Sequence, residues 1–240
     1  KRYSGALTAS RLSDQDPHMI YAQANNANRY VVKTIGSTMN SNIDGDGKSQ
    51  YGSYNYQHNW QTKGTQQYTS NRFNISANMG HSDGWNSGKA STETFFPNQE
   101  HTFGVKDTYR YKHNLKPQLE AKLFAYTDSA NTIDVKVKAS YEKSRKSYEE
   151  KSASYGYQPD QFAYHSLKEA LDAKPGDALY DRLITRDSEY ESTDLQQRGL
   201  NISYIWKHFI GKKGSFALQG YTNLSGTNED THTNHDVEYL

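Results

Sequence analysis

The sequence predicts an all-β protein whose strands form an antiparallel meander, and two observations support this fold class. Hydrophobic residues make up only 33% of the 240 residues and the mean hydropathy is −1.03, yet the chain contains 20 tyrosines. Tyr, Thr, Ser, Asn and Gly in such proportions are typical of many strands joined by polar turns. Apolar and polar residues also alternate in segments along most of the chain, which indicates strands with one apolar face.

The alternating segments define about ten strands in a single domain over residues 1–240. We expect the strands at residues 2–12, 18–26, 51–60, 68–80, 101–114, 119–127, 132–142, 146–157, 199–209 and 215–224, with residues 232–240 as an additional candidate. Short turns are expected at SDQDP (13–17), TKGT (62–65), NLKPQ (114–118), DSAN (128–131) and IGKKG (210–214). Gly, Pro, Asn, Asp and Ser in these segments are the residues that favour tight turns.

Three longer intervals are expected to be loops, at about 27–50, 81–100 and 158–195. The last interval contains a helical pattern over residues 159–187, in two short pieces. Ser166 is a good N-cap for HSLKEALDAK, and Pro175 with Gly176 ends that piece. A helical excursion inside a meander is most simply a long, ordered and partly helical loop.

The hairpin around DSAN shows the alternation most clearly, since the two faces of its strands differ in character. The apolar positions of its second strand are Ile133, Val135, Val137, Ala139 and Tyr141. The polar positions, which point to the opposite face, include Glu120, Lys122, Asp134, Lys136 and Lys138. Charged side chains at mid-strand suit a water-filled barrel lumen or a solvated sheet face, so these five residues are candidate lumen-facing residues.

The apolar faces are expected to meet either lipid or a protein core. Small residues such as Ala77, Ala121 and Ala139 are common on them, and lipid accepts small side chains where a packed core would lose contacts. Tyr and Trp gather at strand ends, as at membrane interfaces. These features favour an outer-membrane β-barrel, or part of one. The alternative is a soluble secreted or periplasmic β-sandwich that acts as a binding or adhesion module.

Charge, cysteine content and motifs narrow the classes of function. The net charge is +1 without a basic tract, which gives no reason to expect nucleic acid as a partner. The chain has no cysteine, so thiolate catalysis and Cys-ligated metals are excluded. It has no GxSxG, P-loop or GxGxxG motif, and we expect neither an enzyme nor a cofactor. A carbohydrate-active enzyme with paired carboxylates is a third hypothesis.

Without a signal-peptide pattern at its start, the chain is expected to be a mature chain or a piece of a longer one.

Aromatic residues of the expected loops are candidates for ligand binding, because exposed rings beside amides stack on sugars or dock a partner. These candidates are Trp85, Phe95, Phe96, Tyr155, Tyr157, Phe162 and Tyr164. The alternative is that these rings pack the loops together or belong to an interfacial aromatic belt.

A weak candidate metal site lies in IDGDGKSQ, where Asp44 and Asp46 are spaced like the start of a calcium loop. The twelfth position of that pattern is Asn55 instead of the Glu that an EF-hand requires. A turn rich in Asp and Gly is therefore the simpler interpretation, and no metal is expected.

Two hairpin segments, together with the order of the asparagine- and tyrosine-rich strands between them, carry a resemblance to a known family. The segments are RYSGALTASRL…HMIYAQANNANRY, with Ala24, Asn25, Asn26 and Asn28, and FAYTDSANTIDVKVKASYEKSRKS, with Asp128, Ser129 and Asn131 at the turn. They resemble the early barrel hairpins of the outer-membrane β-barrel family of Bacteroidetes-type bacteria, which is related to the TonB-dependent receptors. The resemblance extends from the start of the chain to about residue 150, and more weakly beyond.

The resemblance implies the early portion of a barrel of about 22 strands, in the outer membrane of a Gram-negative bacterium. Such a protein takes up or binds a nutrient at the cell surface. The partners it implies are outer-membrane lipid, a TonB-type energising partner or a surface lipoprotein, and a small ligand such as a glycan or peptide. Family members also have a carboxypeptidase-regulatory-like domain and a plug. Neither is in this sequence, so energised transport does not follow from this chain alone.

Overall fold

The computed structural model describes residues 3–26, 29–34, 37–42, 46–61, 71–95, 101–156, 167–211 and 214–240. It confirms an all-β antiparallel meander, with one eight-stranded sheet in the order β1-β2-β5-β6-β7-β8-β9-β10 and a separate β3–β4 hairpin. The strands are β1 (Ser4–Arg11), β2 (His18–Asn25), β3 (Arg29–Thr34), β4 (Ser37–Asn42), β5 (Asp46–Trp60), β6 (Asn71–Phe95), β7 (His101–Tyr126), β8 (Asn131–Tyr155), β9 (Leu183–Ile210) and β10 (Gly214–Tyr239). The helical elements are α1 (Leu167–Asp172) and the 3₁₀ turn η2 (Tyr180–Arg182).

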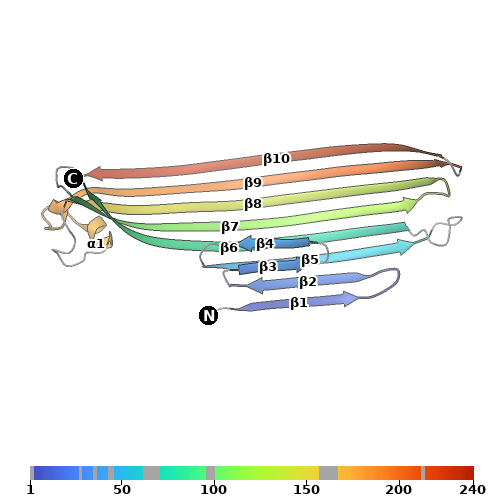
Figure 1. Ribbon diagram of the computed structural model, residues 1–240, viewed down its shortest axis with the longest axis horizontal. Coiled ribbons are helices and arrows are strands. Elements are labelled where there is room, and N and C mark those ends of the chain that lie inside the picture. The colour runs from blue at the N-terminus through green and yellow to red at the C-terminus, as the bar shows by residue number, and fades with distance from the viewer. Residues whose placement is uncertain are drawn as a thin grey trace.

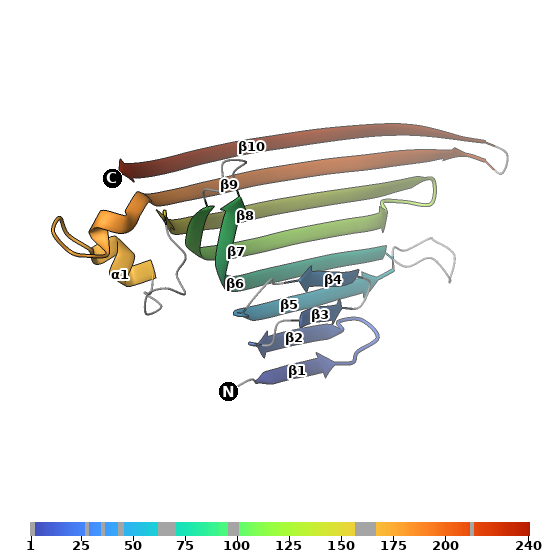
Figure 2. The ribbon, with the colours of Figure 1, turned by 60° about the vertical axis from the view of Figure 1, so that its left-hand side comes forward.

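The two ends of the sheet differ. The β1–β2, β5–β6, β7–β8 and β9–β10 hairpins close at one end, which we call the turn end, and α1 lies at the other, the far end (Figure 1). At the turn end, the predicted DSAN turn is confirmed: the Asp128 carboxylate accepts hydrogen bonds from the backbone N–H of Ala130 at 2.7 Å and from the side chain of Asn131. Figure 2 shows β1 and β10 as the two edges of the sheet.

The predicted turn at NLKPQ is wrong, because residues 114–118 lie inside β7. The ladder to β6 continues through this segment and places Pro117 opposite Met79. The ladder to β8 skips Lys116 and Pro117 and resumes in the same register, as expected at a residue that has no N–H to donate. With this segment inside a strand, hairpins and far-end connections alternate regularly along the chain.

The three expected loops also contain strands. Residues 81–95 continue β6, residues 183–195 belong to β9, and the interval 27–50 contains β3, β4 and the start of β5. These stretches lack apolar alternation, as HSDGWNSGKASTETF shows, since polar residues occupy both of their faces. They are extended because the backbone donors and acceptors pair with neighbouring strands, whatever the side chains are.

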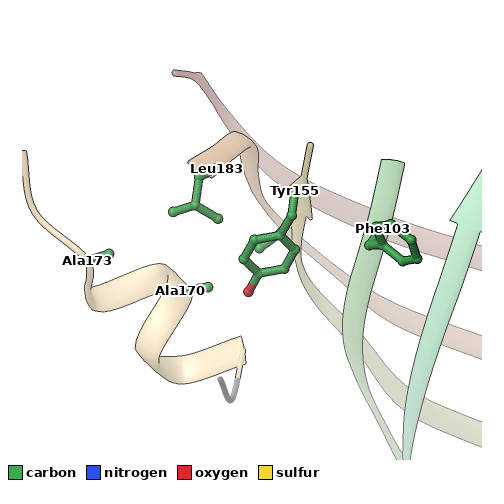
Figure 3. Close-up of a cluster of buried hydrophobic side chains, with 6 residues drawn as sticks. Phe103, Tyr155, Ala170, Ala173 and Leu183 are labelled. Atoms are coloured by element: carbon green, nitrogen blue, oxygen red, sulfur yellow. The ribbon is translucent and has the colours of Figure 1, made fainter. Parts of the chain in front are cut away.

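The expected partly helical loop is confirmed, and it covers the far end of the sheet. Both α1 and η2 fall within residues 159–187, and Gly176 has φ 95° in the turn after Pro175, a conformation that glycine adopts without strain. The proposed cap Ser166 lies outside the described residues. A small core forms here from strand and loop side chains: Phe103, Ala153, Tyr155, Ala170, Ala173 and Leu183 (Figure 3).

Arg186 of β9 attaches this loop to the sheet. Its guanidinium donates hydrogen bonds to the backbone oxygens of Leu171 at 2.9 Å and Ala173 at 3.0 Å, two of the carbonyls that the short helix leaves without an internal partner. It also forms an ion pair with Glu238 of β10 at 2.9 Å. One side chain therefore joins α1 to the last two strands.

We predict that Ala170→Asp detaches α1 from the sheet. Ala170 is fully buried, and an unpaired carboxylate in that position costs roughly 3 kcal/mol or more. Hydrogen exchange should show that the amides of α1 lose protection while those of β6–β9 keep it. Lys168→Asp, at an exposed position of the same helix, is the control and should leave α1 protected. Equal exchange in the two variants would contradict the packing described here.

Candidate functional site

One face of the sheet bears a continuous band of apolar side chains, which we call the apolar belt. Paired residues of an antiparallel ladder place their side chains on the same face, so the register follows the belt from strand to strand. One row crosses all eight strands: Ala9, Ile20, Tyr54, Ala77, Leu119, Ala139, Leu200 and Leu224. Adjacent rows add Leu7, Ala22, Phe73, Ile75, Met79, Leu115, Pro117, Ala121, Leu123, Val135, Val137, Ile202, Tyr204, Phe216 and Leu218.

The apolar belt is open to its surroundings. Leu119 at its centre is 50% exposed, and Met79 and Leu218 on other strands are 55% and 51% exposed. Soluble monomers rarely expose a contiguous apolar patch larger than a few hundred Å². A belt that spans eight strands therefore requires an apolar partner, either lipid or protein.

Aromatic side chains lie at both borders of the belt. Trp60 and Trp206 are at the turn end. The ring of His58 stacks on Trp60 with 5.5 Å between the ring centroids, and the ring of His208 stacks on Trp206 with 6.1 Å between the centroids. At the other border, Trp85 of β6 pairs with Tyr111 of β7 on the same face. The belt is thus bounded on both sides by rings that tolerate a boundary between apolar and wet surroundings.

The opposite face, which we call the polar face, carries the predicted charged residues. Glu120 pairs with Lys138 and Lys122 pairs with Lys136, which confirms that the two strands present these side chains on one face. Glu120 accepts ion pairs from Lys122 at 2.7 Å and Lys136 at 3.3 Å. Asp134 lies on the same face opposite Phe124. Their exposure to a barrel lumen stays a prediction.

A hollow of about 780 Å³ lies over the middle of the sheet and is lined mainly by residues of the polar face. Within it, Lys116 pairs with Glu142 at 2.7 Å. Other lining side chains offer amides, hydroxyls and an ammonium group: Tyr51, Asn78, Lys112, Asn114, Gln118, Asn201, Asn223 and Thr227. Such a lining suits a polar ligand with many hydroxyl or amide groups.

The predicted loop aromatics are distributed differently from the expectation. Trp85 lies within β6 at the border of the apolar belt, and Phe95 ends that strand and is exposed. Tyr155 is 8% exposed in the core under α1, so it is not a loop residue. Trp85 and Phe95 were misplaced because strand residues 81–95 were assigned to a loop, whereas Tyr155 ends β8 and is covered by the helical loop. Three further candidates of this loop region, and Phe96, lie outside the described residues: Tyr157, Phe162 and Tyr164.

The weak metal candidate is not brought together in the described structure, because Asp44 lies outside it and Asp46 begins β5 opposite Trp85. A different group, His81, Asp83 and His113, has its potential ligand atoms within 4.8 Å of one another. His113 Nδ1 is 2.7 Å from Asp83 Oδ1, and His81 Nε2 is 3.4 Å from Asp83 Oδ2. We call these three residues the His–Asp–His cluster; it lies on the face of the apolar belt, next to the border formed by Trp85 and Tyr111.

Sequence reasoning missed this cluster although a signal was present. His81-x-Asp83 and Tyr111-x-His113 are pairs with the spacing that puts two side chains on one face of a strand. Residues 81–100 were expected to form a loop, so no face could be assigned to His81 or Asp83.

Hydrogen bonds from β7 hold the carboxylate of the cluster in place. The Tyr111 hydroxyl donates to Asp83 Oδ1 at 3.0 Å, and His113 Nδ1 lies 2.7 Å from the same oxygen. Asp83 is therefore oriented by two side chains of the neighbouring strand.

Comparison with known proteins gives no relative from which to argue: no protein-family model matches the chain, and no curated protein matches it either. Within the described part of the chain, no helix has both the length and the apolar character needed to cross a membrane. The function is therefore inferred from the geometry of the two sheet faces.

Proposed function

We propose that this sheet is part of the wall of an outer-membrane β-barrel of the TonB-dependent receptor type, which takes up or binds a nutrient at the cell surface. The observation that supports it best is the exposed apolar belt, continuous across eight strands and opposite a charged face. Lipid would cover the belt, and the polar face would line the lumen.

The dimensions of the belt fit a bilayer. Trp85 lies 14 residues along β6 from Asn71, the partner of Trp60. At about 3.3 Å per residue the aromatic borders are roughly 46 Å apart along the strand, or about 35 Å across a bilayer if the strands tilt by about 40°. This value lies between the thickness of the hydrocarbon core, about 30 Å, and that of the whole bilayer, about 40–45 Å.

The difference between the turn end and the far end of the sheet indicates how the barrel would be oriented in the membrane. The belt begins directly at the hairpins of the turn end, where Ile133 follows the DSAN turn and Phe216 follows the start of β10. At the far end, β6–β10 continue well beyond the belt, and apart from the small core under α1 their residues there are mostly polar. Outer-membrane barrels have short turns on the periplasmic side and longer structures outside, so the far end would face the exterior.

The edges of the sheet are consistent with a wall that continues on both sides. In the described structure β1 and β10 are edges and do not pair with each other. Eight strands about 4.8 Å apart account for roughly 38 Å of wall. An open edge inside a bilayer leaves backbone groups without partners, so the proposal requires further strands, from a longer chain or from another chain, to close the barrel.

The ligand would bind on the polar face. The hollow lined by Asn78, Gln118 and Asn201 offers amide groups, and the Lys116–Glu142 pair offers charges of both signs. A glycan or a peptide presents the hydroxyl or amide groups that such a surface can bind. A soluble β-sandwich is the alternative, and in it a second sheet would cover the belt.

A cysteine scan of β7 distinguishes the two architectures, because the natural chain has no cysteine to interfere. Single cysteines at positions 117–123 would carry nitroxide labels on the protein reconstituted in lipid. For the barrel we expect the odd-numbered positions to be accessible to oxygen, which dissolves in lipid, and the even-numbered ones to a water-soluble nickel complex. Odd-numbered positions that are shielded from both reagents would support the sandwich and overturn the proposal.

A charge introduced into the belt should be costly in lipid. We expect Leu119→Arg to reduce the stability of the protein folded into vesicles by about 2–4 kcal/mol, the cost of an arginine on the lipid face near the bilayer centre. Its neighbour Gln118→Arg adds the same side chain to the polar face and should change stability by less than about 1 kcal/mol. Denaturant titration of the two variants measures both values. Similar losses in both variants would argue against a lipid-facing belt.

A further inference from the structure

We propose that the His–Asp–His cluster binds a divalent transition-metal ion of the zinc class. The proposal goes beyond the membrane function and does not rest on it, since it depends only on the side chains of His81, Asp83 and His113. In the part of the chain that the structure describes, this is the group in which three metal-ligating residues converge.

The chemistry of the donors selects the class of ion. Two imidazoles and one carboxylate suit Zn²⁺, Cu²⁺ and Ni²⁺, whereas Ca²⁺ and Mg²⁺ prefer sites made of oxygen ligands. Each oxygen of the Asp83 carboxylate faces a different imidazole, Oδ1 toward His113 and Oδ2 toward His81. The three side chains are 23–29% exposed and lie beside the aromatic border of the belt, so an ion could reach the ligand atoms while the ligands remain packed.

The strands hold the three ligands in position. His81 and Asp83 are two residues apart on β6, and His113 is directly opposite Asp83 on β7. Both strands are internal to the sheet, since β6 pairs with β5 and β7 pairs with β8 at these positions. A site on paired strands is more precisely fixed than one on a loop, so less ordering is needed when an ion binds.

Neighbouring groups support the carboxylate and limit repulsion of a cation. The Tyr111 hydroxyl donates to Asp83 at 3.0 Å and orients it, as groups around bound metals usually do. Arg145 lies opposite His113 on β8, but its guanidinium is held by two hydrogen bonds of 2.7 Å to Asp194. Lys48 lies opposite Asp83 on β5, with an exposed side chain that can turn toward water.

The cluster needs only a small contraction to bind an ion. In a tetrahedral zinc site with bonds of about 2.0–2.2 Å, neighbouring ligand atoms are roughly 3.3 Å apart. The candidate atoms here lie within 4.8 Å of one another, so rotation of the imidazole rings can close the remaining distance. Three protein ligands leave a coordination position for water or for an anion.

Calorimetric titration of the untagged, folded protein with Zn²⁺ tests the proposal, together with Co²⁺ absorption spectra that report coordination. We expect one ion per chain, and we expect His81→Gln and His113→Gln each to weaken binding more than 10-fold. His58→Gln is the matched control, because His58 forms a similar pair with Asp16 at 2.6 Å but belongs to no such three-residue group among the described residues. Circular dichroism establishes that each variant retains its strands.

The outcomes separate a metal site from a simple hydrogen-bonded network. Tyr111→Phe keeps all three ligands and removes only the group that orients Asp83, so it should weaken Zn²⁺ binding about 10-fold. Absence of saturable binding to the native protein would overturn the proposal. Binding that His58→Gln reduces as strongly as His81→Gln would also overturn it, because the ion would then bind scattered histidines.

Discussion

The continuous antiparallel backbone ladder is the interaction on which the rest of this structure depends. Strands β6–β10 are 25–28 residues long, whereas strands of globular proteins usually have about 3–10 residues. The buried apolar side chains of the described residues are few, and most of them are gathered beneath α1. Backbone pairing therefore determines the shape, and the apolar belt determines what that shape must contact. Both proposed sites lie on this one sheet.

The sequence predicted the sheet well where the two faces differ and poorly where they are alike. Residues 132–142 alternate strictly because one face is apolar, and their partner strand, turn and face assignment were all predictable. Residues 81–95 form an equally regular strand, but both of their faces are polar, so no periodicity marks them. Pro117 misled for another reason: a proline usually ends a strand, but here the ladder to β6 continues past it.

The candidate site illustrates the same limit. The charged positions Glu120, Lys136 and Lys138 could be assigned to one face because the belt opposite them is apolar. The His–Asp–His cluster requires the pairing of β6 with β7 next to the Trp85–Tyr111 border of the belt, and only the register supplies that information. It also lies where the apolar surroundings of the belt change to polar ones. A carboxylate there is partly desolvated, and its hydrogen bonds are stronger than they would be in open water.

The apolar belt also determines the geometry of residues that it does not contain. Because the strand period is two, inserting one residue in β6 between Met79 and His81 would turn every later side chain to the other face. In the polar part of β6 that follows, such a shift would exchange one polar face for another. No loss of apolar burial would therefore oppose the wrong register in that segment. The belt corrects the register instead, and the polar part of β6 inherits the parity set there. Between the belt and the cluster, β6 can therefore change in length only by even steps if His81 and Asp83 are to stay on the face of His113.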